Sequence, residues 1–351
     1  MKRKAFVLFT GIAALLPFAG ISQIGGNAIY EFLNLPFSAR TASLGGNLIC
    51  VKDDDINLVA QNPSLLNPSM SNKLALSYIN YFADVNYGYT AYARTYEKLG
   101  NFSAGMQYLN YGKFTEVDET GYVYGNFFAS EYCLNLGYSK AIDSLFSFGA
   151  QLKTIYSALG SFWSIGNAAD IGFTYYNSKR NITIAAVGKN IGMEWRTYNN
   201  VRERLPMEFQ LGISKKPLHA PFRISLIATH LEKWDLTYED PANPTLTEDP
   251  LTHEPIKQSK VKNFGDKLLR HVIIGGELLL TKNFNIRLGY NYERRQELKV
   301  ETRPGLVGFS FGFGFKISKF QISYGHASYH LAGGTNHFTV TTNLSDFYKK
   351  K

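Results

Sequence analysis

Large apolar residues alternate with small or polar ones along most of this chain. The stretch GLVGFSFGFGFKIS, residues 305–318, shows the alternation most clearly, and its large members are Val307, Phe309, Phe311, Phe313 and Phe315. Successive side chains of a β-strand point to opposite faces, so this stretch places a ladder of rings on one face and almost nothing on the other. The pattern predicts a strand with one strongly apolar face.

The same alternation recurs from Lys73 onward and predicts fourteen strands. Their predicted cores are 74–80, 87–94, 102–109, 132–139, 148–156, 168–176, 182–187, 208–214, 222–230, 271–280, 284–293, 307–316, 320–329 and 338–343. Links after even-numbered strands are short, whereas most links after odd-numbered strands are long, the longest running from Lys233 to Arg270. An even strand number with short turns on one side and long loops on the other indicates an outer-membrane barrel.

Glycine falls on the polar face of several of these strands, as at Gly137, Gly212 and Gly289. In a soluble sandwich the apolar faces would pack together and charged residues such as Arg287 and Glu293 would simply be solvated. Three features together favour the other interpretation, in which the rings face lipid. They are the even strand number, the short and long links on opposite sides, and the export signal at the N-terminus that is described next. The lumen would then be lined by small and polar groups.

The N-terminus has the features of a secretory signal peptide over residues 1–22. Basic residues at positions 2–4 precede an apolar run over residues 5–19, and small residues follow at Gly20 and Ser22. A membrane anchor is the alternative, but the run falls short of the ~20 residues that cross a bilayer. No long apolar run follows it, so we expect a multi-pass β-barrel in the outer membrane.

Composition agrees with this assignment. The mean hydropathy of −0.17 and the 15% aromatic content do not fit a disordered chain. Of the net charge of +9, part belongs to the signal peptide and part to a basic tail over residues 346–351. No basic stripe interleaved with exposed aromatics is present, so nucleic acid is not an expected partner.

Residues 23–72 lack the alternation and are interrupted by Pro36, Pro63 and Pro68. A disordered periplasmic tail is one interpretation, but the apolar content argues against it, and the segment is too long for an ordinary loop. We interpret it as a plug inside a barrel formed by residues 73–345, with a short helix through DDINLVAQN. The residues expected to matter in the plug are Arg40, Asn62, Pro63, Asn67 and Pro68.

The sequence carries no signature of an enzyme, a cofactor or a metal site. It has no G-x-S-x-G, P-loop, H-E-x-x-H or C-x-x-C motif, and GFSFGFG is a strand pattern rather than a phosphate loop. Its two cysteines, Cys50 and Cys133, fall in the predicted plug and on the predicted lumen face. They are expected either to form a disulfide that pins plug to wall or to remain two buried thiols.

These residues resemble a known family. The signal peptide, the plug phrase GGNAIYEFLNLPFSARTASLGG, the AQNPSLLNP element and fourteen strands are similar to the FadL-like barrels, and above all to the PorV/PorQ branch of the type IX secretion system. FLNLPFSAR at residues 32–40 and SLGG at residues 43–46 resemble the PorQ type. The resemblance implies a non-enzymatic anchor for a PorZ-like surface protein and, through it, for the PorU sortase and PorV, which join secreted cargo to anionic lipopolysaccharide in the outer-membrane lipid.

Loops would make the contact with such a partner. The candidate stretches are 113–130, 189–207 and 233–270, with Tyr122, Tyr124, Trp195, Arg196, Tyr198, Trp234, Tyr238, Lys257, Lys260 and Lys262 as candidate contact residues. Two other functions stay open: a FadL-like transporter of hydrophobic molecules and a PorV-like cargo shuttle. Polar lumen residues such as Gln151, Lys153 and Asp170 favour a static plug over a hydrophobic conduit.

Overall fold

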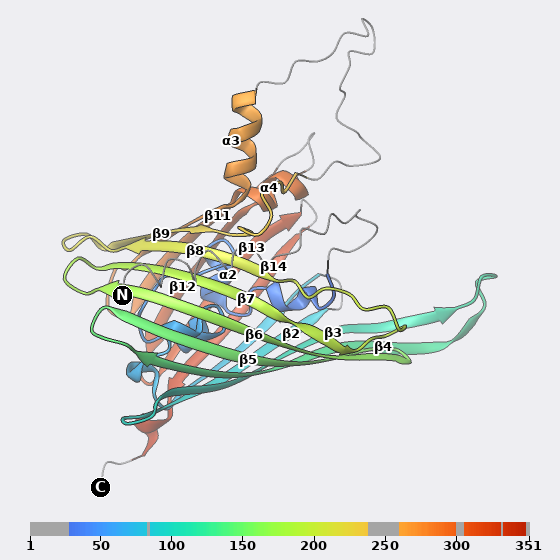
Figure 1. The fold of residues 1–351 in the computed structure, drawn as a ribbon, viewed down its shortest axis with the longest axis horizontal. Helices are drawn as coiled ribbons and strands as arrows, with labels where there is room; N and C mark the ends of the chain where they lie inside the picture. The colour runs from blue at the N-terminus through green and yellow to red at the C-terminus, as the bar shows by residue number, and fades with distance from the viewer. Residues whose placement is uncertain (1–27, 83–84, 238–259, 300–304, 331–332, 349–351) are drawn as a thin grey trace, which may run out of the picture.

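Fourteen antiparallel strands close into a barrel (Figure 1). The structure is a computed structural model, and it describes residues 28–82, 85–237, 260–299, 305–330 and 333–348. The strands are β1 (Lys73–Asn80), β2 (Asn86–Tyr96), β3 (Gly100–Val117), β4 (Val123–Ala141), β5 (Phe146–Leu159), β6 (Phe162–Asn177), β7 (Ile182–Arg196), β8 (Glu208–Lys215), β9 (Phe222–Ala228), β10 (Val272–Leu278), β11 (Phe284–Asn291), β12 (Phe309–Ile317), β13 (Phe320–His330) and β14 (Gly333–Asn343). Each strand pairs with its neighbours in sequence, and β1 pairs with β14.

The fourteen-stranded barrel predicted from the alternation is confirmed, including the direction of the phenylalanine ladder. Phe309, Phe311 and Phe313 point outward and are 45%, 44% and 39% exposed. The small residues that alternate with these rings face inward and are buried among groups that fill the lumen, namely Ser310, Gly312 and Gly314. The ladder is one member shorter than predicted, because β12 begins at Phe309 and Val307 is buried in the preceding turn.

Two of the predicted long loops are in large part strand. β3 and β4 have 18 and 19 residues, so most of the stretch 113–130 is a two-stranded ribbon with a turn at residues 118–122. β7 likewise continues to Arg196, well into the stretch 189–207. The alternation does not mark the outer part of the ribbon, because both of its faces are largely exposed and neither needs to be apolar.

The eleventh strand is shorter than predicted. β11 ends at Asn291, and Tyr292 and Glu293 begin the helix α4 (Tyr292–Leu298) instead of extending the wall. The Asn291 side chain accepts a hydrogen bond from the backbone N–H of Arg294 at 2.9 Å, which is an N-cap contact that stabilises the start of the helix. Tyr292 is therefore not part of an aromatic girdle on the barrel wall.

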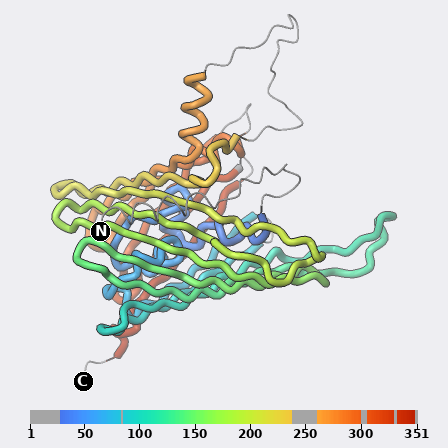
Figure 2. Tube along the Cα trace, in the orientation of Figure 1, coloured from blue at the N-terminus to red at the C-terminus, as the bar shows by residue number. Residues whose placement is uncertain are grey.

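The N-terminal segment lies inside the barrel, as Figure 2 shows for the blue part of the trace. It consists of short helical turns: η1 (Glu31–Asn34), α2 (Ala39–Ser43), η2 (Ile56–Ala60), η3 (Pro63–Leu65) and η4 (Pro68–Met70). The short helix predicted through DDINLVAQN is η2. Apolar side chains of the plug and the wall pack into shared clusters, for example Phe37 of the plug on Tyr89 of β2, with ring centroids 4.6 Å apart. The plug and the wall therefore share two apolar clusters.

Two further helical elements lie outside the bore. The helix α3 (Lys260–Arg270) precedes β10, and the 3₁₀ turn η5 (Leu344–Phe347) follows β14. No helix in the described ranges is long and apolar enough to cross a membrane. The predicted signal peptide, residues 1–22, and the last three residues of the predicted basic tail lie outside the described residues.

Candidate functional site: the interface between plug and barrel wall

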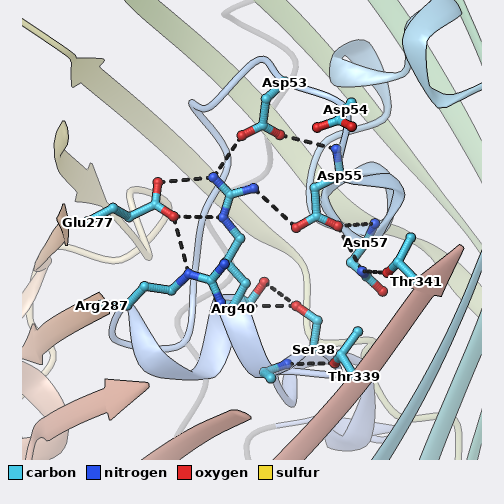
Figure 3. Close-up of polar contacts among 12 residues, drawn as sticks. Ser38, Arg40, Asp53, Asp54, Asp55, Asn57, Glu277, Arg287, Thr339 and Thr341 are labelled. Carbon is cyan, nitrogen blue, oxygen red and sulfur yellow. Dashed lines mark hydrogen bonds and ion pairs between the residues drawn. The ribbon is translucent and has the colours of Figure 1, made fainter. Parts of the chain in front are cut away.

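Arg40 is the centre of the contact between plug and wall (Figure 3). It lies in α2 and is buried. Its Nε donates to Glu277 Oε1 at 2.9 Å and its Nη2 to Glu277 Oε2 at 3.0 Å, so the guanidinium grips this β10 carboxylate with two parallel bonds. Its remaining donors reach Asp55 at 3.1 Å and Asp53 at 2.7 Å, both in the plug. One side chain thus ties two plug segments to one wall strand.

Two arginines of the wall complete this network. Arg223 of β9 contacts Glu277 at 2.8 Å and Asp53 at 3.3 Å. Arg287 of β11 donates from Nε to Glu277 Oε1 at 3.3 Å. Three arginines therefore face three carboxylates, and we call these six residues the Arg40 network. Charges taken out of water are tolerated when they are paired in this way, and removal of one partner is costly because the others stay buried.

Local structure places the plug side of this network. Ser38 caps α2 by accepting from Thr41 N–H, and the N–H of Ala39 donates to Thr339 Oγ1 of β14 at 2.9 Å. Asp55 caps η2 by accepting from the N–H of Asn57 at 3.0 Å while it also binds Arg40. The short helical turns are therefore positioned by caps and by the wall, and they hold the charged groups in place.

The inward-facing glycines allow the plug backbone to touch the wall. A Cβ added at Gly149 would lie within 3.0 Å of the backbone of Pro63, one at Gly289 within 3.0 Å of Leu44 and Gly45, and one at Gly325 within 3.0 Å of Ala39. The bare face of the strands therefore leaves no open lumen at these points. It is bare because the plug occupies the space.

This contact gives a first prediction. We expect Gly289→Ala to lower the free energy of unfolding by about 1–3 kcal/mol, because the new methyl group would overlap plug backbone that cannot swing aside. Gly276→Ala in the adjacent strand is the matched control, since the nearest atom that its new methyl group meets, the Leu288 carbonyl oxygen, would lie 3.9 Å away. Urea unfolding in lipid vesicles, followed by aromatic fluorescence, measures both. Equal stability of the two variants would contradict a tight contact between plug and wall.

A second polar group lies beside η3. Lys153 of β5 pairs with Asp170 of β6 at 2.7 Å and donates to Asn190 at 2.7 Å. Lys189 of β7 donates to Gln61 of the plug at 3.2 Å. The lumen charges that the sequence analysis noted at Lys153 and Asp170 are therefore paired with each other, and a neighbouring lysine binds the plug.

The predicted plug residues divide into two groups. Asn62 is fully buried, donates to the Ile49 carbonyl at 2.8 Å and to Thr174 of β6 at 3.1 Å, and caps η3 ahead of the buried Pro63. Asn67 caps η4 and donates to the Asp53 carbonyl at 2.8 Å, which steadies the loop of the Arg40 network. Pro68 is exposed and touches less of the wall.

The proposed disulfide is wrong, and the alternative of two separate thiols is correct. Cys50 and Cys133 are both buried and free, and they belong to different apolar clusters. The Cys133 thiol donates to Asn135 within its own strand at 3.2 Å, whereas Cys50 lies against β8 beside Gly212. The sequence pattern places both cysteines at the lumen, but it does not show which part of the wall each of them contacts.

The candidate loop residues are scattered rather than gathered into one patch. Tyr122 and Tyr124 lie at the tip of the β3–β4 ribbon and are 67% and 68% exposed. Trp195 and Arg196 lie at the end of β7, where Arg196 stacks over Trp163 at 3.5 Å. Tyr198 is not a free surface residue, because its hydroxyl bonds Ser157 and its ring packs against the core.

The remaining loop candidates surround α3. Trp234 packs its ring against Phe264 of that helix, with centroids 5.6 Å apart, and Lys260 and Lys262 are exposed on its first turn. Tyr238 and Lys257 lie outside the described residues. The structure therefore does not bring the predicted contact residues together at one place.

A charged group at the rim joins α4 to the loop after β9. Burial of His230 opposes its protonation, but a 3.2 Å contact with Glu232 and the nearby carboxylates of the same rim raise the pKa of His230 to about 9. His230 is thus positively charged at neutral pH. It lies 3.9 Å from Glu293 of α4, whose pKa burial raises to about 7.

In the described parts of the chain, no group of three or more His, Cys, Asp or Glu side chains could hold a metal ion.

Most of the Arg40 network cannot be read from the sequence. The sequence places Arg40 in the plug and Arg287 on the polar face of its strand, but it does not identify Asp53, Asp55, Arg223 or Glu277 as their partners. The signal was present, since Arg223 and Glu277 stand at inward positions of strands whose outward positions are apolar. The sequence does not show, however, where the plug passes these strands.

No protein-family model and no curated protein matches the sequence. Among solved structures, one with a TM-score above 0.5 supports the fold, and others are similar to a lesser degree. The toluene transporter TbuX of Ralstonia pickettii is similar in structure, with a TM-score of 0.51, 11% identity, and coverage of 88% of this chain and 98% of that chain. The toluene transporter TodX of Pseudomonas putida has a TM-score of 0.48 at 11% identity, covering 88% and 96%. A Pseudomonas aeruginosa FadL homologue has a TM-score of 0.46 at 10% identity, covering 88% and 98%. The chain is a closed fourteen-stranded transmembrane β-barrel of the FadL-like type, with its N-terminal segment as the plug.

Proposed function

We propose that the protein is a non-catalytic anchor in the outer membrane that holds a surface partner through its extracellular elements. The observation that carries this proposal is the Arg40 network, in which ion pairs join the plug directly to β10 and β9, while β11 is linked to them through Glu277 of the wall. A conduit needs a plug that moves, whereas an anchor needs a rigid barrel. A buried network of paired charges favours the rigid barrel.

The β3–β4 ribbon is the surface that best suits a partner. β3 pairs with β2 only as far as Asn110, and β4 pairs with β5 only from Ala129 onward, so the outer part of the ribbon has two free edges. It carries two aromatic pairs, the exposed Phe114 with the half-buried Phe127 and the exposed Tyr122 with Tyr124. An isolated two-stranded ribbon is only marginally stable in water, and exposed aromatic surface of this kind marks interaction sites. Figure 1 shows the ribbon reaching well beyond the rest of the barrel.

In this proposal the partner is a PorZ-like surface protein, as in the PorQ type of the PorV/PorQ branch. Through that partner the anchor would serve the PorU sortase and PorV, which attach secreted cargo to anionic lipopolysaccharide. The support for this assignment is the resemblance of residues 32–46 together with the fixed plug. The competing proposal is transport of a hydrophobic molecule. It is favoured by the fold shared with TbuX, which is described as a toluene transporter.

One experiment with a locked plug separates the two proposals. Gly212 of β8 faces Cys50, and a Cβ added there would lie 3.1 Å from the Cys50 Sγ. Gly212→Cys is therefore expected to form a disulfide between wall and plug in the oxidising periplasm, after a small adjustment of both residues. Gly212→Ser is the control of similar size that cannot form the bond.

An anchor should keep its function when the plug is locked. We expect affinity purification from outer membranes to recover a large surface protein equally well with the wild type, Gly212→Cys and Gly212→Ser, and to lose it when residues 113–127 are replaced by a short turn. Uptake of toluene and of a long-chain fatty acid into cells should not depend on the lock. Uptake that falls with Gly212→Cys, is restored by reductant and persists in Gly212→Ser would overturn the anchor in favour of transport.

A further inference from the structure

The helix α3 presents its apolar side away from the protein. Val261, Phe264 and Leu268 are spaced at i, i+3 and i+7, and Val261 and Phe264 are 81% and 58% exposed. Residues at this spacing share one face of a helix. Leu269 and Trp234, which packs on Phe264, are exposed as well and extend the same surface. We call this set the α3 apolar face.

The hydrogen bonds and ion pairs that join α3 to the rest of the chain come from its polar side. Asp266 accepts a hydrogen bond from Tyr292 of α4 at 2.7 Å and pairs with Arg270 at 2.8 Å. Lys267 pairs with Asp235 at 2.6 Å. A helix on a water-soluble protein does the opposite, burying its apolar face and exposing its charges. The reversed orientation indicates that the medium around the α3 apolar face is not water.

The position of the helix relative to the wall identifies that medium. β9 and β10, which flank the loop that contains α3, have only seven residues each, fewer than the ~9–11 that carry a strand across a bilayer. α3 ends at Arg270, one residue before β10, whose outward side chains are apolar and lipid-facing, as at Ile274. Figures 1 and 2 show α3 standing away from the wall, across the direction of β5 to β7. The C-terminal end of α3 therefore adjoins a strand with a lipid-facing surface, and the helix extends outward from it.

The charge of the helix suits the surface of an anionic membrane. Four basic side chains (Lys260, Lys262, Lys267 and Arg270) and one acidic side chain (Asp266) give α3 a net charge of +3 (4 − 1). Lys260 and Lys262 are exposed at the end of the helix farthest from β10. Amphipathic helices with basic residues on the polar face and aromatic and aliphatic residues on the other lie in the plane of the membrane interface.

From this geometry we propose that α3 lies in the outer leaflet of the membrane, at the boundary between anionic headgroups and acyl chains. In that position α3 covers the membrane interface on the side of the barrel where β9 and β10 are too short to cross the whole bilayer. This inference does not depend on the function proposed above. It assigns the last part of the longest loop, Lys260–Arg270, to lipid rather than to a protein partner.

Two neighbouring positions test the proposal in the full-length protein. Val261→Cys and Lys262→Cys, each carrying a nitroxide spin label, are reconstituted into vesicles of phosphatidylcholine with phosphatidylglycerol. Both native cysteines are buried and should not react. We expect the label at 261 to collide with oxygen and the label at 262 with a water-soluble nickel complex, so that the ratio of oxygen to nickel collisions is several-fold higher at 261.

A charge reversal tests the headgroup contact separately. Lys260→Glu combined with a label at 261 should lower that ratio in anionic vesicles and change it little in pure phosphatidylcholine. The three substituted residues, 260, 261 and 262, are all exposed, so we expect the variants to fold. Heat-modifiable migration in electrophoresis should show folded barrels for every variant. Labels at 261 and 262 that are equally accessible to nickel would overturn the proposal. Protection of position 261 only after a surface protein is added would also overturn it, in favour of a protein-binding helix.

Discussion

Replacing Arg40 with methionine is expected to lower the free energy of unfolding by about 3–5 kcal/mol, the usual range for breaking a buried ion pair by removing one partner. Methionine fills most of the volume, so the effect would come from charge. The variant leaves two arginines facing three carboxylates, and Glu277 and Asp55 each lose a hydrogen-bond donor in a region shielded from water. Urea unfolding in lipid vesicles measures the loss, and protease digestion of the plug shows where the structure has loosened.

A second variant makes this prediction specific to the network. Arg40→Met combined with Glu277→Gln leaves two arginines and two carboxylates, so the charges balance again. We expect the double variant to lose clearly less free energy of unfolding than the two single variants lose in sum, because residues in one network do not act additively. If the two losses simply add, Arg40 and Glu277 are not coupled, and the rigid plug would have to be explained by apolar packing alone.

The alternation in the sequence predicted the barrel because each wall strand separates two different media. Lipid selects Phe309, Phe311 and Phe313 on one side, and the plug selects glycine and polar residues on the other. Both faces of the outer part of the β3–β4 ribbon are largely exposed to water, so its residues show no such alternation. From the sequence it therefore could not be distinguished from a loop. The start of α4 is a similar case, since a single N-cap at Asn291 ends the strand.

The partners in the candidate site could not be predicted in the same way. Arg40 and Glu277 lie 237 positions apart in sequence, and their contact depends on the route of the plug through the bore. The plug has no period of its own, because short turns capped by Ser38, Asp55 and Asn62 give it its path. Composition showed that charges would face the lumen but not which plug residue each would meet. The same limitation explains why the sequence left two alternatives open for Cys50 and Cys133, a disulfide or two separate thiols, of which the second is found.

Removing the plug should have the largest functional effect. The wall strands pair only with one another around the closed ring, so a chain lacking residues 28–71 is expected to fold as a barrel with an open, polar bore. In planar bilayers its conductance should rise by at least about tenfold over the intact protein, since larger barrels with empty interiors conduct as aqueous channels. The intact protein and the Gly212→Cys variant should both stay near the leak level of the bilayer.

The polar groups left behind explain why the open bore would conduct rather than collapse. Without the plug, Lys189 loses its hydrogen bond to Gln61 and Arg223 loses its ion pair with Asp53, and both side chains are expected to hydrate. Arg287 keeps its ion pair with Glu277 of the wall. Glycines such as Gly149 and Gly289 add no bulk to refill the space. Heat-modifiable migration confirms that the deleted barrel is folded before it is measured. A folded barrel without added conductance would mean that the wall closes the bore by itself, and the plug would then be a partner of the wall rather than its stopper.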